Sequence, residues 1–189
     1  HHIKDQMAPL DPVTHQFRIL KMLGIPPHQL SEKDHQEPNW CGGVEDSHLE
    51  LWPTEADQLY IDEFLKSEWV SANQLLIGIN ISASSRWISK NWPLGHLVEL
   101  CEELSRQDIR IVITGTDKDL RDANILMNKL KNIKLINACG KTTVNQLACL
   151  IKRCAVFISS DSAPLHIAAS QDTAFIALFG ATEPKRHLS

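Results

Sequence analysis

The amino-acid sequence predicts an α/β fold with a Rossmann-like, doubly wound parallel sheet. From residue 75 onward, short apolar runs rich in β-branched residues alternate with longer amphipathic segments. Apolar runs of this kind are typical of strands that are buried on both faces of a parallel sheet. Five strands alternating with four helices leave few other topologies, because parallel strands are joined by right-handed crossovers.

The expected elements follow one another closely along the chain. The strands are predicted at residues 75–81, 109–114, 133–136, 155–159 and 174–179. The helices between them are predicted at residues 93–105, 118–130 and 143–152, with a fourth that begins near Ala163. Asp117 and Asp119 lie at a helix start, where acidic residues are expected for capping and dipole reasons.

The residues before this pattern are expected to be a separate segment. Residues 1–70 would form a helical N-terminal segment that packs on a domain of residues 71–189. Within the segment, residues 14–23 are predicted as a helix with Phe17, Leu20 and Leu23 on one face.

A short edge strand is predicted at residues 48–52. Thr54 then begins a capping-box pattern, T-E-A-D, which opens a helix that runs to about residue 68. We expect its inward face to contain Leu59, Phe64 and Leu65.

Composition excludes several classes of partner. A net charge of −4 and an isoelectric point near 6.1 do not favour nucleic acid, because phosphate backbones are bound by a basic face. No apolar run approaches the ~20 residues that span a bilayer, so we expect a soluble, cytoplasmic chain. The five cysteines contain no C-x-x-C pair, which predicts buried free thiols: Cys41, Cys101, Cys139, Cys149 and Cys154.

The turn after the first predicted strand argues against a dinucleotide cofactor. A dinucleotide fold has G-x-G-x-x-G there, whereas residues 82–86 read S-A-S-S-R. We therefore expect neither NAD nor FAD, and no other cofactor. His28, His35 and His48 match no local ligand motif, so no metal is expected either.

The turn after the fourth predicted strand is a candidate anion site. Asp161 and Ser162 stand at N-cap positions, and Pro164 suits the first helical turn. A helix that begins there directs free backbone N–H groups toward the carboxyl ends of the strands, where open α/β sheets bind anionic ligands. An ordinary capped helix start is the alternative.

Two motifs together resemble one enzyme family. They are D-S-A-P-L-H at 161–166 with A-L-F-G-A-T-E-P at 177–184, and S-A-S-S-R at 82–86 with K-N-W-P at 90–93. The chain resembles the ADP-heptose:lipopolysaccharide heptosyltransferases of glycosyltransferase family nine over residues 75–187. The resemblance implies the C-terminal, nucleotide-sugar-binding half of a GT-B enzyme. The acceptor domain with the general base would be missing, and residues 1–70 would hold the interdomain linker.

The resemblance implies several contacts to the donor phosphates. Lys90 matches the lysine that contacts them, with a solvated loop lysine as the alternative, and Ser84 and Ser85 match hydroxyl residues that bind the same groups. Ser162 would bind a phosphate together with the backbone amides of the next residues, Ala163, Pro164 and Leu165.

Other positions are implied to contact the nucleoside or the sugar. Asp119 aligns with an acidic residue that reaches the nucleoside, and Thr142 lies in the turn that lines the adenine pocket. Asp161 would meet hydroxyls of the sugar or ribose, and His166 would point either to the ligand or into the core. Asn145 stands where the family often has glutamate, which leaves the identity of the nucleotide or sugar open.

The expected function is donor binding in an inverting glycosyltransferase of lipopolysaccharide core synthesis, with ADP-heptose as the donor. The acceptor, a lipopolysaccharide core or other glycolipid, would bind the missing domain, so this chain alone is expected to be inactive. Peripheral contact with the inner face of the cytoplasmic membrane stays open. The alternatives are a GT-B transferase or epimerase that uses a UDP-sugar, and a catalytically silent nucleotide-sugar-binding domain.

Overall fold

A single parallel sheet forms the centre of the domain. The computed structural model describes residues 51–83 and 90–179. Five strands pair in the order β3-β2-β1-β4-β5, and every pair is parallel. They are β1 (Leu75–Asn80), β2 (Ile109–Thr114), β3 (Leu135–Asn137), β4 (Val156–Ser160) and β5 (Phe175–Leu178). This order is that of a doubly wound Rossmann-like sheet, which confirms the predicted fold class.

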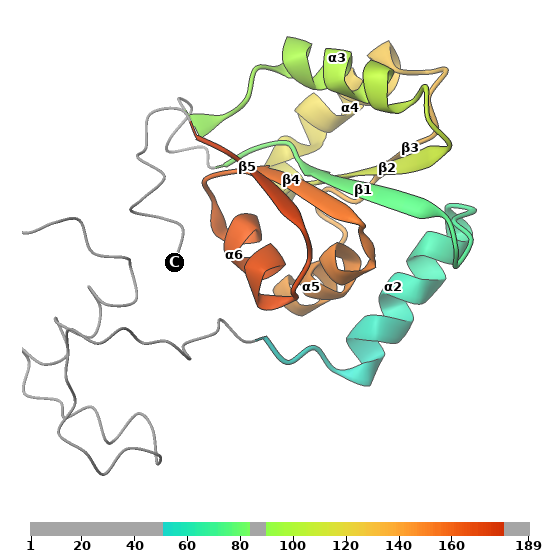
Figure 1. Cartoon of the computed structure of the whole chain (residues 1–189), viewed down its shortest axis with the longest axis vertical. Helices are drawn as coiled ribbons and strands as arrows, with labels where there is room; N and C mark the ends of the chain where they lie inside the picture. Colours follow the sequence, from blue (N-terminus) through green and yellow to red (C-terminus); the bar gives the residue numbers. More distant parts are fainter. Residues whose placement is uncertain (1–50, 84–89, 180–189) are drawn as a thin grey trace, which may run out of the picture. The chain divides into compact units, whose positions relative to one another are not determined.

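Helices cover both faces of the sheet (Figure 1). One face is covered by α3 (Leu94–Leu104) and α4 (Leu120–Lys129), the latter preceded by the short 3₁₀ turn η3 (Asp117–Asp119). The other face is covered by α2 (Glu55–Ser67), α5 (Val144–Arg153) and α6 (Ala163–Ser170). The strand bounds lie within two residues of the predicted ones.

The core consists of two apolar layers, one on each side of the sheet. Along β2, Ile111 and Ile113 pack toward α3 and α4, whereas Val112 packs toward α2 and α5. This alternation follows from the two-residue period of a strand. Because the middle of β2 is buried on both faces, its three consecutive residues Ile111, Val112 and Ile113 are all apolar rather than alternating with polar ones.

Helix α2 begins as predicted but presents a different face to the core. Thr54 and Asp57 form the expected capping box. However, Leu59 is 55% exposed, whereas Ile61 is fully buried beside Leu65. Residues 59 and 61 lie about 200° apart on a helix, so they cannot share a face. The prediction that Leu59 faces inward is therefore wrong.

The last strand is less buried than predicted. β5 pairs only with β4 among the described residues, and Phe175 and Ile176 are 37% and 50% exposed. An edge strand has a neighbour on one side only, which the apolar sequence did not reveal. Leu51 and Trp52 are not in a strand, so the predicted edge strand is wrong over this part, and residues 48–50 lie outside the described residues. The predicted helix at 14–23 also lies outside them.

Four cysteines are buried free thiols, as predicted. Burial raises the pKa of Cys101 to about 11 and that of Cys139 and Cys154 to about 12. Cys149 is buried in the same way, and Cys41 lies outside the described residues. Thiols with such raised pKa values are unreactive near neutral pH.

Candidate functional site

The site lies between β1 and β4, where the connecting helices change from one face of the sheet to the other. β1 and β4 are neighbouring strands, but the helix after β1 packs on one face and the helix after β4 on the other. The turns that follow the two strands therefore diverge at the carboxyl edge of the sheet. In open α/β sheets, ligands bind at this topological switch point.

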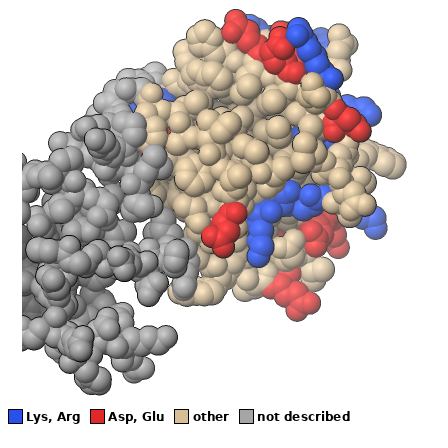
Figure 2. Space-filling model, viewed as in Figure 1, with Lys and Arg blue, Asp and Glu red and all other residues tan. Residues whose placement is uncertain are grey.

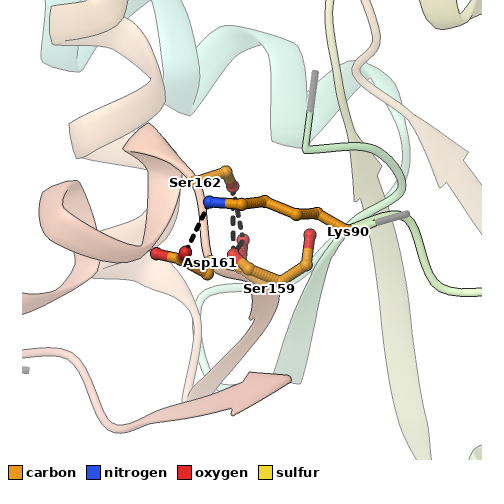
Figure 3. A network of polar contacts seen from close by, with 5 residues as sticks. Lys90, Ser159, Asp161 and Ser162 are labelled. Carbon is orange, nitrogen blue, oxygen red and sulfur yellow. Dashed lines mark hydrogen bonds and ion pairs between the residues drawn. The ribbon is translucent and has the colours of Figure 1, made fainter. Parts of the chain in front are cut away.

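An ion pair joins the two turns. Lys90 Nζ lies 2.6 Å from Asp161 Oδ2, although the two residues are 71 positions apart in the sequence. Figure 3 shows the Lys90 side chain extended from its turn to the Asp161 carboxylate. The Asp161 side chain is 5% exposed and that of Lys90 is 21% exposed. The structure thus brings together two motif residues that sequence alone placed only at the same edge of the sheet.

Ser162 is the N-cap residue of α6, but its side chain does not cap the helix. Its Oγ instead lies 3.1 Å from Ser159 Oγ and 3.1 Å from the Ser160 carbonyl oxygen. By contrast, the N-cap threonines of α2 and α5, Thr54 and Thr143, both accept a backbone hydrogen bond. The first turn of α6 is therefore left without a side-chain cap.

The backbone narrows the set of amides that could bind an anion. Pro164 has no N–H group, and the Leu165 N–H donates to the Ser162 carbonyl at 3.0 Å. The Leu165 side chain is buried in the core. Ala163 is exposed, and its N–H has no hydrogen-bond partner among the residues that the structure describes. Of the three predicted amides, only that of Ala163 is available.

Two asparagines that the sequence analysis did not single out organise the same turns. Asn80, the last residue of β1, donates from Nδ2 to the Ser82 carbonyl and to Ser162 Oγ. Asn91 accepts the Ala83 N–H through Oδ1 at 2.7 Å. A polar residue at the end of a buried strand was the signal that could have identified Asn80.

The turns after β2 and β3 lie beside each other at the same edge. The Gly140 N–H donates to the Gly115 carbonyl at 3.0 Å, which links the turn of Asp119 to that of Thr142. Asp119 Oδ2 accepts from the Thr116 N–H at 2.7 Å and from its hydroxyl at 2.8 Å. The expected capping role of Asp119 is therefore confirmed, whereas its contact with a nucleoside stays a prediction.

Of the four remaining predicted site residues, two are described by the structure. Thr142 and His166 are both half-buried, and their contacts with a ligand stay predictions. Ser84 and Ser85 lie outside the described residues. Within the described residues, no group of three or more His, Cys, Asp or Glu side chains is arranged to hold a metal ion.

Charge on the face seen in Figure 2 is mixed, with Lys and Arg interspersed among Asp and Glu. Over residues 51–83 and 90–179, every helix is too short or too polar to cross a bilayer.

A separate surface hollow lies away from the predicted site residues. It has a volume of about 430 Å³ and includes Trp52, Thr54, Lys152 and Gln171 in its wall. None of the predicted donor-binding residues that the structure describes lines it.

Comparison with known proteins identifies the family. The family described as "Glycosyltransferase family 9 (heptosyltransferase)" matches residues 46–188. The chain belongs to glycosyltransferase family 9. It is 30% identical to lipopolysaccharide heptosyltransferase 2 of Salmonella typhimurium over 142 residues. This matched region covers 71% of this chain and 39% of that protein. It is 35% identical over 105 residues to lipopolysaccharide heptosyltransferase 3 of Escherichia coli, covering 54% of this chain and 31% of that protein.

Solved structures have the same fold. The family 9 glycosyltransferase of Veillonella parvula superposes with a TM-score of 0.75 at 23% identity, covering 95% of this chain and 47% of that one. The E. coli ADP-heptose lps heptosyltransferase II gives a TM-score of 0.62 at 26% identity, covering 72% of this chain and 41% of that one. The chain therefore spans less than half the length of these relatives.

Proposed function

We propose that this domain binds the nucleotide-sugar donor of a family 9 glycosyltransferase, and that the donor is ADP-heptose. The observation that supports this most directly is the ion pair of Lys90 and Asp161 at the switch point, which joins the two motifs of the family. The choice of adenine as the nucleobase of the donor is supported by a solved relative, the E. coli heptosyltransferase WaaC, whose structure was obtained with ADP.

The geometry suggests how each residue would act on the donor. A lysine ammonium has three N–H donors, so Lys90 can keep its bond to Asp161 and still donate to a phosphate oxygen. Asp161 would hold the ammonium in place as well as meeting a sugar or ribose hydroxyl. The N–H of Ala163 would add a second donor to the diphosphate.

In the proposed reaction, an acceptor hydroxyl attacks the anomeric carbon while the bond to ADP breaks. Negative charge then grows on the leaving diphosphate, and preorganised donors such as Lys90 Nζ and the Ala163 N–H stabilise that charge. These donors lead us to expect donor binding without a divalent ion. The general base would come from the acceptor domain of the family.

We further propose that sugar transfer requires that acceptor domain and is absent from this chain alone. The acceptor would be a lipopolysaccharide core. Because such an acceptor is lipid-anchored, we expect the reaction at the inner face of the cytoplasmic membrane.

Calorimetric titration with ADP, UDP, GDP and CMP in the presence of a chelator tests the proposal. We expect ADP to bind most tightly of the four. Tighter binding of UDP would favour a UDP-sugar transferase or epimerase, and no binding of any nucleotide would favour a silent domain. Binding of ADP only after addition of Mg²⁺ or Mn²⁺ would contradict the metal-independent site.

A further inference from the structure

Asn80 occupies an unusual position for a polar side chain. It is the last residue of β1, at the centre of the sheet, and is only 7% exposed. Buried amides are costly unless their polar atoms are hydrogen-bonded. The partners of Asn80 therefore indicate why an amide is placed there.

Each bond of Asn80 reaches a different strand end. Its Nδ2 donates to the Ser82 carbonyl in the turn after β1, and to Ser162 Oγ in the turn after β4, 3.4 Å away. Its Oδ1 accepts from Thr114 Oγ1 at the end of β2, also at 3.4 Å. The side chain thus links three neighbouring strand ends at the carboxyl edge.

The link to Ser162 also accounts for the missing helix cap. Ser162 is held by Asn80, Ser159 and the Ser160 carbonyl, so its hydroxyl is directed away from the first turn of α6. The same bonds join the start of α6, and with it the N–H of Ala163, to Ser82 after β1. The bond from the Ala83 N–H to Asn91 Oδ1 then connects that point to the residue that follows Lys90.

We infer that Asn80 is a positioning residue for the donor diphosphate: it sets the separation between the Lys90 turn and the start of α6. The inference rests on the proposed function, because it assumes that both turns contact the same diphosphate. Asn80 itself would not touch the donor. It would act through Ser82 and Ser162.

Replacement of Asn80 by leucine tests this, because leucine has the same branching at Cγ but neither donates nor accepts hydrogen bonds. We expect Asn80→Leu to weaken ADP binding about tenfold, equivalent to ~1.4 kcal/mol, and to leave adenosine binding within about twofold. Adenosine has no phosphate and is insensitive to the separation of the two turns. A purely structural role would instead weaken both ligands equally, per folded molecule, and that outcome would overturn the inference.

Thr114→Val is the matched control. It removes the third bond of Asn80, which the Thr114 hydroxyl donates, and leaves the Thr114 carbonyl free to accept the Ile81 N–H as before. We expect it to lower thermal stability and leave ADP binding unchanged. Loss of ADP binding equal to that of Asn80→Leu would show that the core, rather than the turns, is responsible. If Asn80→Leu fails to fold by circular dichroism, Asn80→Ala, which adds no bulk, replaces it.

A ligand-free measurement separates this inference from the proposed function. The N–H groups of Ala83 and Leu165 are hydrogen-bonded within the two turns, and that of Ala138 is bonded to β2 away from them. In the variant we expect faster hydrogen exchange at Ala83 and Leu165 but not at Ala138. Unchanged exchange at both turns overturns the role of Asn80 even if the unmodified chain binds ADP. If the unmodified chain binds no ADP, the proposed function fails and with it the role toward the diphosphate, whereas the exchange pattern separately shows whether Asn80 holds the two turns together.

Discussion

Replacement of Lys90 should lower both the affinity for ADP and the free energy of unfolding, each by its own amount. Its 2.6 Å bond to Asp161 is a charge-assisted hydrogen bond, and the pair is neither fully exposed nor fully buried, at 21% and 5% side-chain exposure. Exposed ion pairs contribute up to about 1 kcal/mol, whereas breaking a buried pair costs about 3–5 kcal/mol. We therefore expect Lys90→Met to lower the free energy of unfolding by about 1–3 kcal/mol.

The effect on ADP should be larger than that of the matched change at Asp161. A charged hydrogen bond to phosphate contributes about 1.5–3 kcal/mol, so Lys90→Met should weaken ADP binding by roughly tenfold to a hundredfold. Asp161→Asn leaves the ammonium in place but less well held, and should weaken ADP binding less. Lys131→Met is the control, because Lys131 is an exposed lysine remote from the site in sequence; it should change neither quantity.

The double variant Lys90→Met/Asp161→Asn separates binding from folding. With both charges gone, no buried carboxylate is left beside a missing cation, so stability should recover relative to Lys90→Met alone. Affinity for ADP should not recover, because the phosphate donor is still absent. Calorimetry and thermal melts measure the two effects. Unchanged ADP affinity in Lys90→Met, together with lower stability, would show that the ion pair is structural and refute the assignment.

Three further predictions concern the fold. The Thr54 backbone N–H donates to the Asp57 carboxylate and lowers the pKa of Asp57 below its usual 3.8. The stabilisation from Asp57 should therefore be present above pH 3.8 and lost as pH falls through the lowered pKa, and acid unfolding of Asp57→Asn should lack this loss. Burial raises the pKa of Cys101, Cys139 and Cys154, so the free energy of unfolding should fall as pH rises above 9. Alkylation at pH 8, followed by peptide mass spectrometry, should label these three thiols only in the unfolded chain. A Cβ at Gly78 would lie 2.5 Å from the Phe157 ring, so Gly78→Ala should destabilise the domain by about 1–3 kcal/mol in urea unfolding, and an unchanged midpoint would contradict this packing.

The sheet could be predicted because its signals are local. Each strand is a short apolar run and the crossovers of parallel strands are right-handed, so a parallel, doubly wound sheet could be predicted without any knowledge of long-range contacts. The same reasoning placed the turns that contain Lys90 and Asp161 at one edge. The phase of α2 was harder, because Leu59 and Ile61 are equally apolar and only the packing against α5 selects between them.

Side-chain pairing across the sheet could not be predicted. The bond from Lys90 to Asp161 depends on the adjacency of β1 and β4 and on how far each side chain extends from its turn. The contacts of Asn80 depend on three strand ends at once. Such contacts are set by tertiary geometry, whereas motif spacing reports only which residues share an edge.

The central claim is that ADP binds at the switch point between β1 and β4. Hydrogen exchange of the chain with and without ADP, followed by mass spectrometry of its peptides, locates the ligand most directly. We predict slower exchange in peptides that contain residues 90–93 and 160–166, and unchanged exchange around the hollow that includes Trp52 and Gln171. Slower exchange confined to that hollow, with residues 90–93 and 160–166 unaffected, would contradict the account.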